Sequence, residues 1–158
     1  AFATSLRKWL ICIFEIIVGS DFFYGRMSEC FTCTFYCQTE NGAFPDVEWT
    51  DFALNVLSWW SNAVGEAIYV KETKFKLLFE DGPFWIDAVK RDDAVTLHFN
   101  TDRRGIPIIP DAQIPFRDLA EAVERAMRSF SSALYLAGKA EDARMAAEQA
   151  AYLRRRIS

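Results

Sequence analysis

The stretch from Phe44 to Val64 reads FPDVEWTDFALNVLSWWSNAV and holds three of the five tryptophans of the chain. Its large apolar side chains recur at steps of three and four residues, which predicts one amphipathic helix with a wide apolar face. This face comprises Trp49, Phe52, Ala53, Val56, Leu57, Trp60 and Val64. We expect Asp46 or Thr50 to cap the first turn. A helix of this kind has to be covered by other elements of the fold.

Trp59 and Trp60 are neighbours in this predicted helix. Adjacent helical residues point about 100° apart around the axis, so the two rings cannot face the same core. Trp60 shares its side of the helix with Val56 and Val64. We therefore expect Trp60 to be buried and Trp59 to lie near an edge, where a partner can reach it.

Strands surround the Trp-rich stretch. Alternating or continuous apolar residues predict strands over residues 9–18, 29–38, 75–80, 84–90 and 94–100. The turn at residues 80–83 joins two of them into a hairpin that we expect to cover the helix. Gly105 and three prolines predict an extended connector without regular structure over residues 101–115.

Two helices complete the chain. A long amphipathic helix begins at Phe116 and ends at Gly138, and its ion pairs Glu121 with Arg125 and Glu124 with Arg128 are predicted to face solvent. An alanine-rich helix occupies residues 139–158. The predicted order is ββ-α-βββ-α-α. This order indicates an α+β fold with a mostly antiparallel sheet of about five strands and helices packed on one face.

Length and composition bound the function. The 158 residues match one domain, so we expect a single domain over residues 1–158 with an irregular lead-in at residues 1–8. The apolar run at residues 9–18 resembles a signal peptide, but Glu15 interrupts it and it is half the length of a membrane span. The net charge of −4 argues against a nucleic-acid partner. We expect a cytoplasmic protein with neither a membrane nor a nucleic-acid partner.

Cysteine and histidine are the candidates for metal binding or catalysis. Cys30, Cys33 and Cys37 have a spacing like that of a metal site, but on a strand Cys30 and Cys33 project to opposite faces. Cys33 and Cys37 share a face about 13 Å apart. We expect packing roles for these thiols, although a disulfide to Cys12 stays geometrically open. His98 is the only histidine, lies mid-strand and accompanies no catalytic motif, so we expect no catalytic residue, metal or cofactor.

Three segments together carry a resemblance. They are the Trp-rich stretch, the hairpin sequence FEDGPFW at residues 79–85 and the sequence IPFRDLAEAV at residues 114–123. These segments resemble small bacterial proteins that are encoded beside polymorphic or contact-dependent toxins as immunity proteins. The resemblance covers residues 14–136. It implies a cytoplasmic single domain that neutralises a toxin by direct occlusion, without a cofactor, and it transfers no site residue.

We therefore expect a non-catalytic partner-binding protein, with a cognate toxin as the partner if the resemblance holds. Tryptophans anchor interfaces and carboxylates complement a basic partner, so the candidate partner-binding residues are Trp59, Trp85, Asp81 and Asp87. Two alternatives stay open. One is a structural domain that forms homo-oligomers through the alanine-rich C-terminal helix. The other is a small enzyme or ligand-binding protein with a pocket of Trp and Phe rings between helix and sheet.

Overall fold

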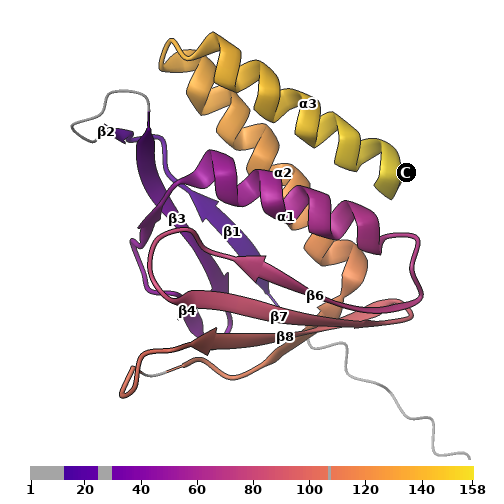
Figure 1. Cartoon of the computed structure of the whole chain (residues 1–158). Coiled ribbons are helices and arrows are strands. Elements are labelled where there is room, and N and C mark those ends of the chain that lie inside the picture. Colours follow the sequence, from indigo (N-terminus) through magenta and orange to yellow (C-terminus); the bar gives the residue numbers. More distant parts are fainter. Residues whose placement is uncertain (1–12, 25–29, 107) are drawn as a thin grey trace, which may run out of the picture.

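The computed structural model describes residues 13–24, 30–106 and 108–158, which form two antiparallel sheets and three helices (Figure 1). In the first sheet, β3 pairs with every other strand, and the members are β1 (Phe14–Val18), β2 (Phe23–Tyr24), β3 (Phe31–Thr39), β4 (Gly42–Phe44) and β5 (Thr50–Asp51). The second sheet follows chain order and consists of β6 (Glu72–Leu78), β7 (Phe84–Arg91), β8 (Ala94–Thr101) and β9 (Ala112–Pro115). The helices are α1 (Ala53–Ala67), α2 (Phe116–Leu136) and α3 (Ala140–Ile157).

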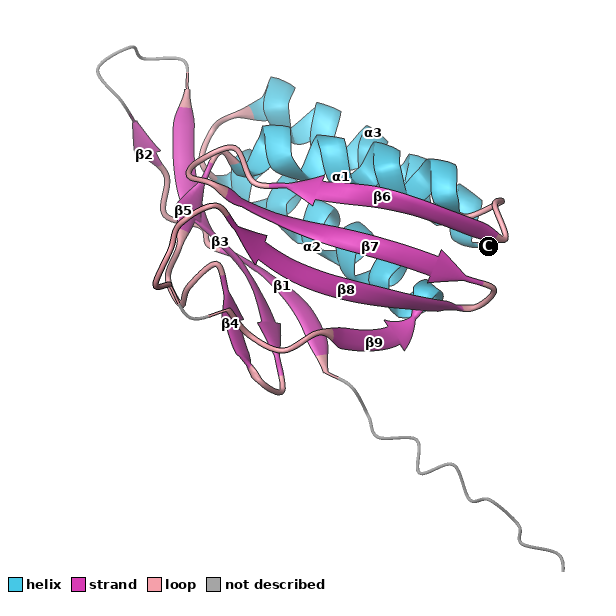
Figure 2. Ribbon diagram, turned by 60° about the horizontal axis from the view of Figure 1, so that its bottom comes forward, coloured by secondary structure: helices cyan, strands magenta, loops and turns pink. Residues whose placement is uncertain are grey.

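The α+β class and the predicted order of strands and helices are confirmed. All three helices lie on the same side of the strands (Figure 2). The five predicted strands correspond to β1, β3, β6, β7 and β8, but they are divided between two sheets. The described part of β1 turns Phe14, Ile16 and Val18 toward the core, as the alternation predicts. Residues 1–8 and Cys12 lie outside the described residues.

Four short strands, β2, β4, β5 and β9, accompany the predicted ones. β9 lies in the stretch for which we expected no regular structure, so that expectation is wrong. Its last residue, Pro115, is opposite Ala94 of β8. A proline lacks the N–H group that a central strand needs, but an edge strand such as β9 pairs on one side only and tolerates it.

The Trp-rich helix is shorter than predicted. α1 begins at Ala53, so Trp49 precedes the helix instead of belonging to its apolar face. The backbone N–H of Trp49 donates to the carbonyl of Asp46 in a turn, and Glu48 has a φ of 62°, which no helix accommodates. The next two residues pair with β3 as β5. Neither Asp46 nor Thr50 caps the helix, because Asp46 lies in the turn and Thr50 lies in β5, both before the helix begins.

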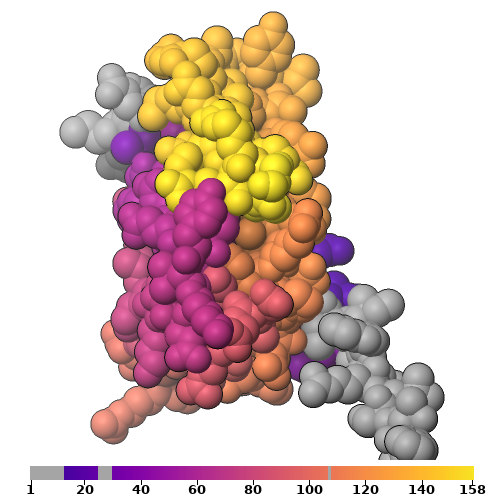
Figure 3. Space-filling view, turned by 90° about the vertical axis from the view of Figure 1, so that its right-hand side faces the viewer, coloured from indigo at the N-terminus to yellow at the C-terminus, as the bar shows by residue number. Residues whose placement is uncertain are grey.

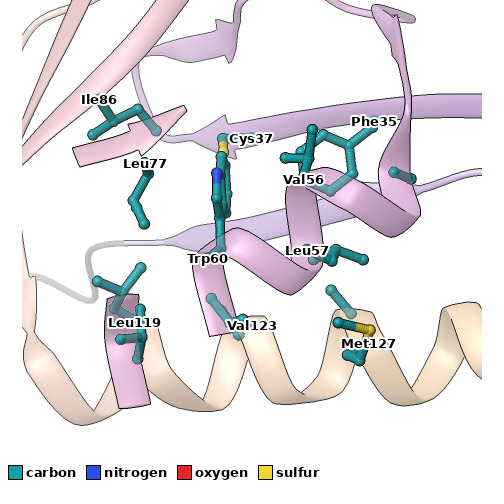
Figure 4. Packing of buried hydrophobic residues seen from close by; sticks show 14 of the residues in the cluster. Phe35, Cys37, Val56, Leu57, Trp60, Leu77, Ile86, Leu119, Val123 and Met127 are labelled. Carbon is teal, nitrogen blue, oxygen red and sulfur yellow. The ribbon is translucent and has the colours of Figure 1, made fainter. Parts of the chain in front are cut away.

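Trp60 lies at the centre of the core. Its side chain is 0% exposed and its ring packs edge-on against Phe35 and Phe79, each with ring centroids 5.3 Å apart (Figure 4). The indole Nε1 donates to the carbonyl of Leu78 at 2.8 Å. Trp59 is 43% exposed, so the predicted asymmetry between the two rings is confirmed. Trp and Phe rings thus fill the space between helix and sheet, which is where the alternative prediction placed a ligand pocket.

The cysteines of β3 pack as predicted. Cys33 and Cys37 are fully buried on its core face. Cys30 is exposed and precedes the strand, so the packing role expected for it is wrong. Burial raises the pKa of Cys33 to about 12, and the nearby charge of Asp51 adds to the effect. Burial also raises the pKa of Cys37. Both thiols are therefore protonated and inaccessible at neutral pH.

We expect iodoacetamide at pH 8 to modify Cys30 in the folded chain and to leave Cys33 and Cys37 intact, because alkylation needs a thiolate that solvent can reach. Mass spectrometry of the digested protein measures the three sites separately. In a denaturant control, all three should react. Native labelling of Cys33 as fast as that of Cys30 would contradict the burial of β3.

The three helices pack on one another. α3 lies across both α1 and α2 (Figure 3), and its buried positions are mostly alanine: Ala143, Ala146, Ala150 and Leu153. The alanine stripe is thus used for contacts within the chain. Glu124 of α2 does not face solvent as predicted. It is 3% exposed because α3 covers it and brings Arg154 to 3.1 Å from its carboxylate, while Arg128 lies at 3.5 Å.

The predicted ion pair between Glu124 and Arg128 is present, but the other predicted pair on α2 is wrong. Glu121 lies 3.0 Å from Arg117, one turn before it, instead of pairing with Arg125. No helix within the described ranges has the length and apolar character needed to cross a membrane.

Candidate functional site

The second sheet has one face against the core and one face toward solvent. Along β7, Phe84, Ile86 and Ala88 are buried, and the residues between them are half-buried on the other side. Figure 2 shows the helices behind this sheet, so none covers its other side. We call this surface the open sheet face. Strand alternation and register place the following residues on it: Lys74, Lys76, Leu78, Trp85, Asp87, Val89, Thr96, His98, Asn100 and Gln113.

Four of these residues form a connected group around Asp87, which we call the Trp85 cluster: Lys76, Trp85, Asp87 and Asn100. The indole Nε1 of Trp85 donates to Asp87 Oδ2 at 3.2 Å, and Asn100 Nδ2 donates to the same oxygen at 2.8 Å. Lys76 Nζ lies 3.3 Å from Asp87 Oδ1 and 5.3 Å from the centroid of the Trp85 ring. Asp87 therefore holds the indole, the amide and the ammonium group together.

The strand register explains this arrangement. Lys76 is directly opposite Asp87 across β6 and β7, and Trp85 is directly opposite Asn100 across β7 and β8. Side chains that are directly opposite on one face of an antiparallel pair have Cβ atoms about 5 Å apart and interact. The result is a half-buried aromatic ring with a fixed orientation on a surface that solvent reaches.

His98 lies beside the cluster, opposite Asp87 in the register of β7 and β8. Its Nδ1 is 2.6 Å from Asp111 Oδ2, an arrangement that orients histidine in many catalytic sites. Nucleophilic catalysis also needs a hydroxyl or thiol within hydrogen-bonding distance of the histidine. Within the described residues, the His98 side chain has no partner other than Asp111. The pair can hold an imidazole in place, but it lacks the third member of a triad.

Asp51 is a buried carboxylate away from the open sheet face. It accepts hydrogen bonds from the backbone N–H of Phe52 at 2.7 Å and of Asp81 at 3.1 Å. Burial raises the pKa of Asp51, and these hydrogen bonds oppose the rise. The side chain connects the start of α1 to the turn between β6 and β7, which is a structural role. Elsewhere in the described ranges, no group of three His, Cys, Asp or Glu residues could hold a metal ion.

The structure brings together two of the four predicted partner-binding residues. Trp85 and Asp87 are hydrogen-bonded on the open sheet face. Asp81 is exposed in the turn before β7, and Trp59 is exposed on α1, in the helix layer behind the sheet. The four residues therefore do not form one surface.

Sequence reasoning missed Lys76 and Asn100. The signal was present in the hairpin: once the turn at residues 80–83 is known, counting back along both strands places Lys76 opposite Asp87. Asn100 follows in the same way from the tight turn between β7 and β8, which places it opposite Trp85.

Comparisons with known proteins find nothing similar to this chain. No family model matches it, and searches of curated proteins and of solved structures find no significant match.

Proposed function

We propose that this chain is a non-catalytic protein-binding domain and that the Trp85 cluster is its contact surface. The observation that carries the proposal is a half-buried tryptophan, held by Asp87 and Lys76, on a sheet face that no helix covers. Tryptophan is among the residues that contribute most to binding energy at protein interfaces. Because the ring is already fixed in the free chain, its burial by a partner costs little side-chain entropy.

The narrower proposal is an immunity protein that binds a cognate toxin in the cytoplasm and covers its active surface. The resemblance of residues 14–136 to immunity proteins supports this partner. The net charge of −4 would steer a basic toxin toward the chain, although Lys76 offsets Asp87 at the cluster itself. The cluster would then contribute contact area and hydrogen bonds more than charge.

We expect Trp85→Ala to weaken binding to the toxin domain encoded beside this chain by more than about tenfold, because the variant removes the central anchor of the interface. Calorimetric titration measures the affinity. Trp59→Ala is the matched control: the same truncation of an exposed ring, but behind the sheet. Both variants should keep the wild-type circular dichroism spectrum and remain folded at the temperature of the titration.

The titration has two other informative outcomes. Loss of binding in the Trp59 variant alone would move the interface to the outer side of α1 and would contradict a role for the Trp85 cluster. Unchanged binding in both variants would exclude both tryptophans. If the neighbouring gene encodes no toxin, affinity capture from the native host, with the wild type and both variants as bait, provides the same comparison.

A further inference from the structure

A shallow hollow of about 330 Å³ lies on the open sheet face, beside the Trp85 cluster. Every strand of the second sheet contributes to its lining: Lys74 from β6, Arg91 from β7, Thr96 and His98 from β8, and Gln113 from β9. Lys74, Thr96 and Gln113 belong to one row that crosses the sheet through Val89. The hollow is thus built by the register of four strands.

Two cations in this hollow are not neutralised. Within the part of the chain that the structure describes, neither Lys74 nor Arg91 has an ion pair or a side-chain hydrogen bond. The neighbouring lysines differ, because Lys76 pairs with Asp87 and Lys71 pairs with Asp92. In the same hollow, His98 differs from these two cations because its Nδ1 lies 2.6 Å from Asp111 Oδ2.

Two further polar residues of the lining can donate hydrogen bonds, beside the apolar Val89 and Ala94. Thr96 carries a hydroxyl and Gln113 carries an amide NH2, and both can donate to an anionic oxygen. Because Nδ1 of His98 faces Asp111, its Nε2 is the ring nitrogen left for a ligand. Arginine and lysine together form strong, charge-assisted hydrogen bonds to oxyanions.

We propose that this hollow binds a phosphate group. Phosphate carries a charge close to −2 at neutral pH, which matches the two unpaired cations, whereas a single carboxylate would leave one of them uncompensated. The volume corresponds to roughly ten water molecules at about 30 Å³ each, so a phosphate ester fits as well as the free ion. The proposal stands independently of the protein partner, because no residue of the Trp85 cluster lines the hollow.

Two carboxylates lie near this site: Asp111 is held by His98, and Glu72 is close to Arg91. Glu72 is directly opposite Arg91 in the register of β6 and β7, although the two side chains are not ion-paired. Its negative charge opposes the binding of an anion near the guanidinium group. Removing this charge therefore provides a variant that should bind more tightly.

The test is an NMR titration of the full-length chain at constant ionic strength with inorganic phosphate, O-phosphoserine, serine and acetate. We expect saturable shifts of the Thr96 and Gln113 amide signals with the two phosphate compounds. Serine and acetate should cause no such shifts. Tighter binding of O-phosphoserine would identify an esterified phosphate as the ligand, and tighter binding of inorganic phosphate would identify the free ion. Both results support the site, while equal binding of acetate, or shifts that never saturate, would overturn it.

Variants separate the site from a general attraction of anions. Lys74→Gln and Arg91→Gln should each weaken phosphate binding by about tenfold, since each removes one charge-assisted contact. Lys76→Gln removes the same charge from the same strand and face but outside the lining, and it should change the affinity less than twofold. Glu72→Gln should tighten binding. If Lys76→Gln weakens binding as much as Lys74→Gln, the hollow is not a site.

Trp85→Ala should leave phosphate binding unchanged, so this proposal and the protein-binding proposal can fail separately.

Discussion

Replacement of Trp60 by alanine is expected to lower the free energy of unfolding by about 3–5 kcal/mol, the range for truncating a buried tryptophan. The ring is fully buried between β3 and the end of β6, where it contacts Phe35 and Phe79. Its removal leaves a cavity that the surrounding rings can fill only in part. Denaturant titration measures the loss, which is a large share of the stability of an ordinary domain.

Two variants make the Trp60 result specific. Trp59→Ala truncates the adjacent ring, which is 43% exposed, and should cost about 1 kcal/mol or less. Trp60→Phe keeps most of the apolar volume but removes the partly buried hydrogen bond to the carbonyl of Leu78, which should cost about 1 kcal/mol. Equal destabilisation by the two alanine variants would mean that α1 is buried all round.

Lys90→Met is expected to lower the free energy of unfolding by about 2–4 kcal/mol, because it removes three hydrogen bonds from the ammonium group to buried or partly buried carbonyls. Lys90 is only 6% exposed and faces the core from β7. Its ammonium group donates to the carbonyls of Ala67 at 2.9 Å, Ile68 at 3.3 Å and Val70 at 2.6 Å, at the end of α1 and just after it. The ammonium group also lies 4.4 Å from the centroid of the Phe116 ring. One lysine thus donates to the last carbonyl of α1 and to two carbonyls just after it, and its positive charge lies at the negative end of the helix dipole.

Lys74→Met is the control for Lys90. Lys74 is on the neighbouring strand, has its side chain on the open sheet face and makes no ion pair with a described residue. Its replacement should change the stability by less than about 0.5 kcal/mol. A loss in Lys90→Met no larger than in the control would contradict the capping role.

The pH dependence provides a second measurement on Lys90. Burial lowers the pKa of Lys90 from 10.5, its value in an unfolded chain. Between the lowered pKa and 10.5 the unfolded chain binds a proton that the folded chain has lost, so stability rises with pH in this window. The stability of the wild type relative to Lys90→Met should therefore increase as the pH rises toward 10.5.

Local periodicity was enough to predict the secondary elements that have one clear buried side. The alternation in β7 and β8, the end of α2 shortly before Gly138 and the different exposures of Trp59 and Trp60 all follow from geometry within a single strand or helix. In these cases the neighbouring side chains in the sequence carry the information. A period of two or of 3.6 residues is a local property that no distant contact has to supply.

The candidate site could be predicted in part for the same reason. Trp85 and Asp87 share one face of β7 because they are two residues apart, so their proximity follows from the sequence. Lys76 and Asn100 come from neighbouring strands, and their places depend on the register that the turns impose. A shift of one residue in that register would send them to the opposite face, which is why the four-residue cluster was not predicted.

The sequence by itself thus determined the α+β class, the order of the elements and the buried face of each amphipathic segment. Only the tertiary structure decided the places of polar and bulky residues that are not part of a regular apolar pattern. Trp49 lies outside the helix because residues 50–51 pair with β3. Glu124 is buried because α3 brings Arg154 to it. Lys90 of β7 donates to the carbonyl at the end of α1. Each of these contacts joins segments that are distant in the chain, and its energy depends on burial and on hydrogen-bond partners that exist only when the elements have packed together.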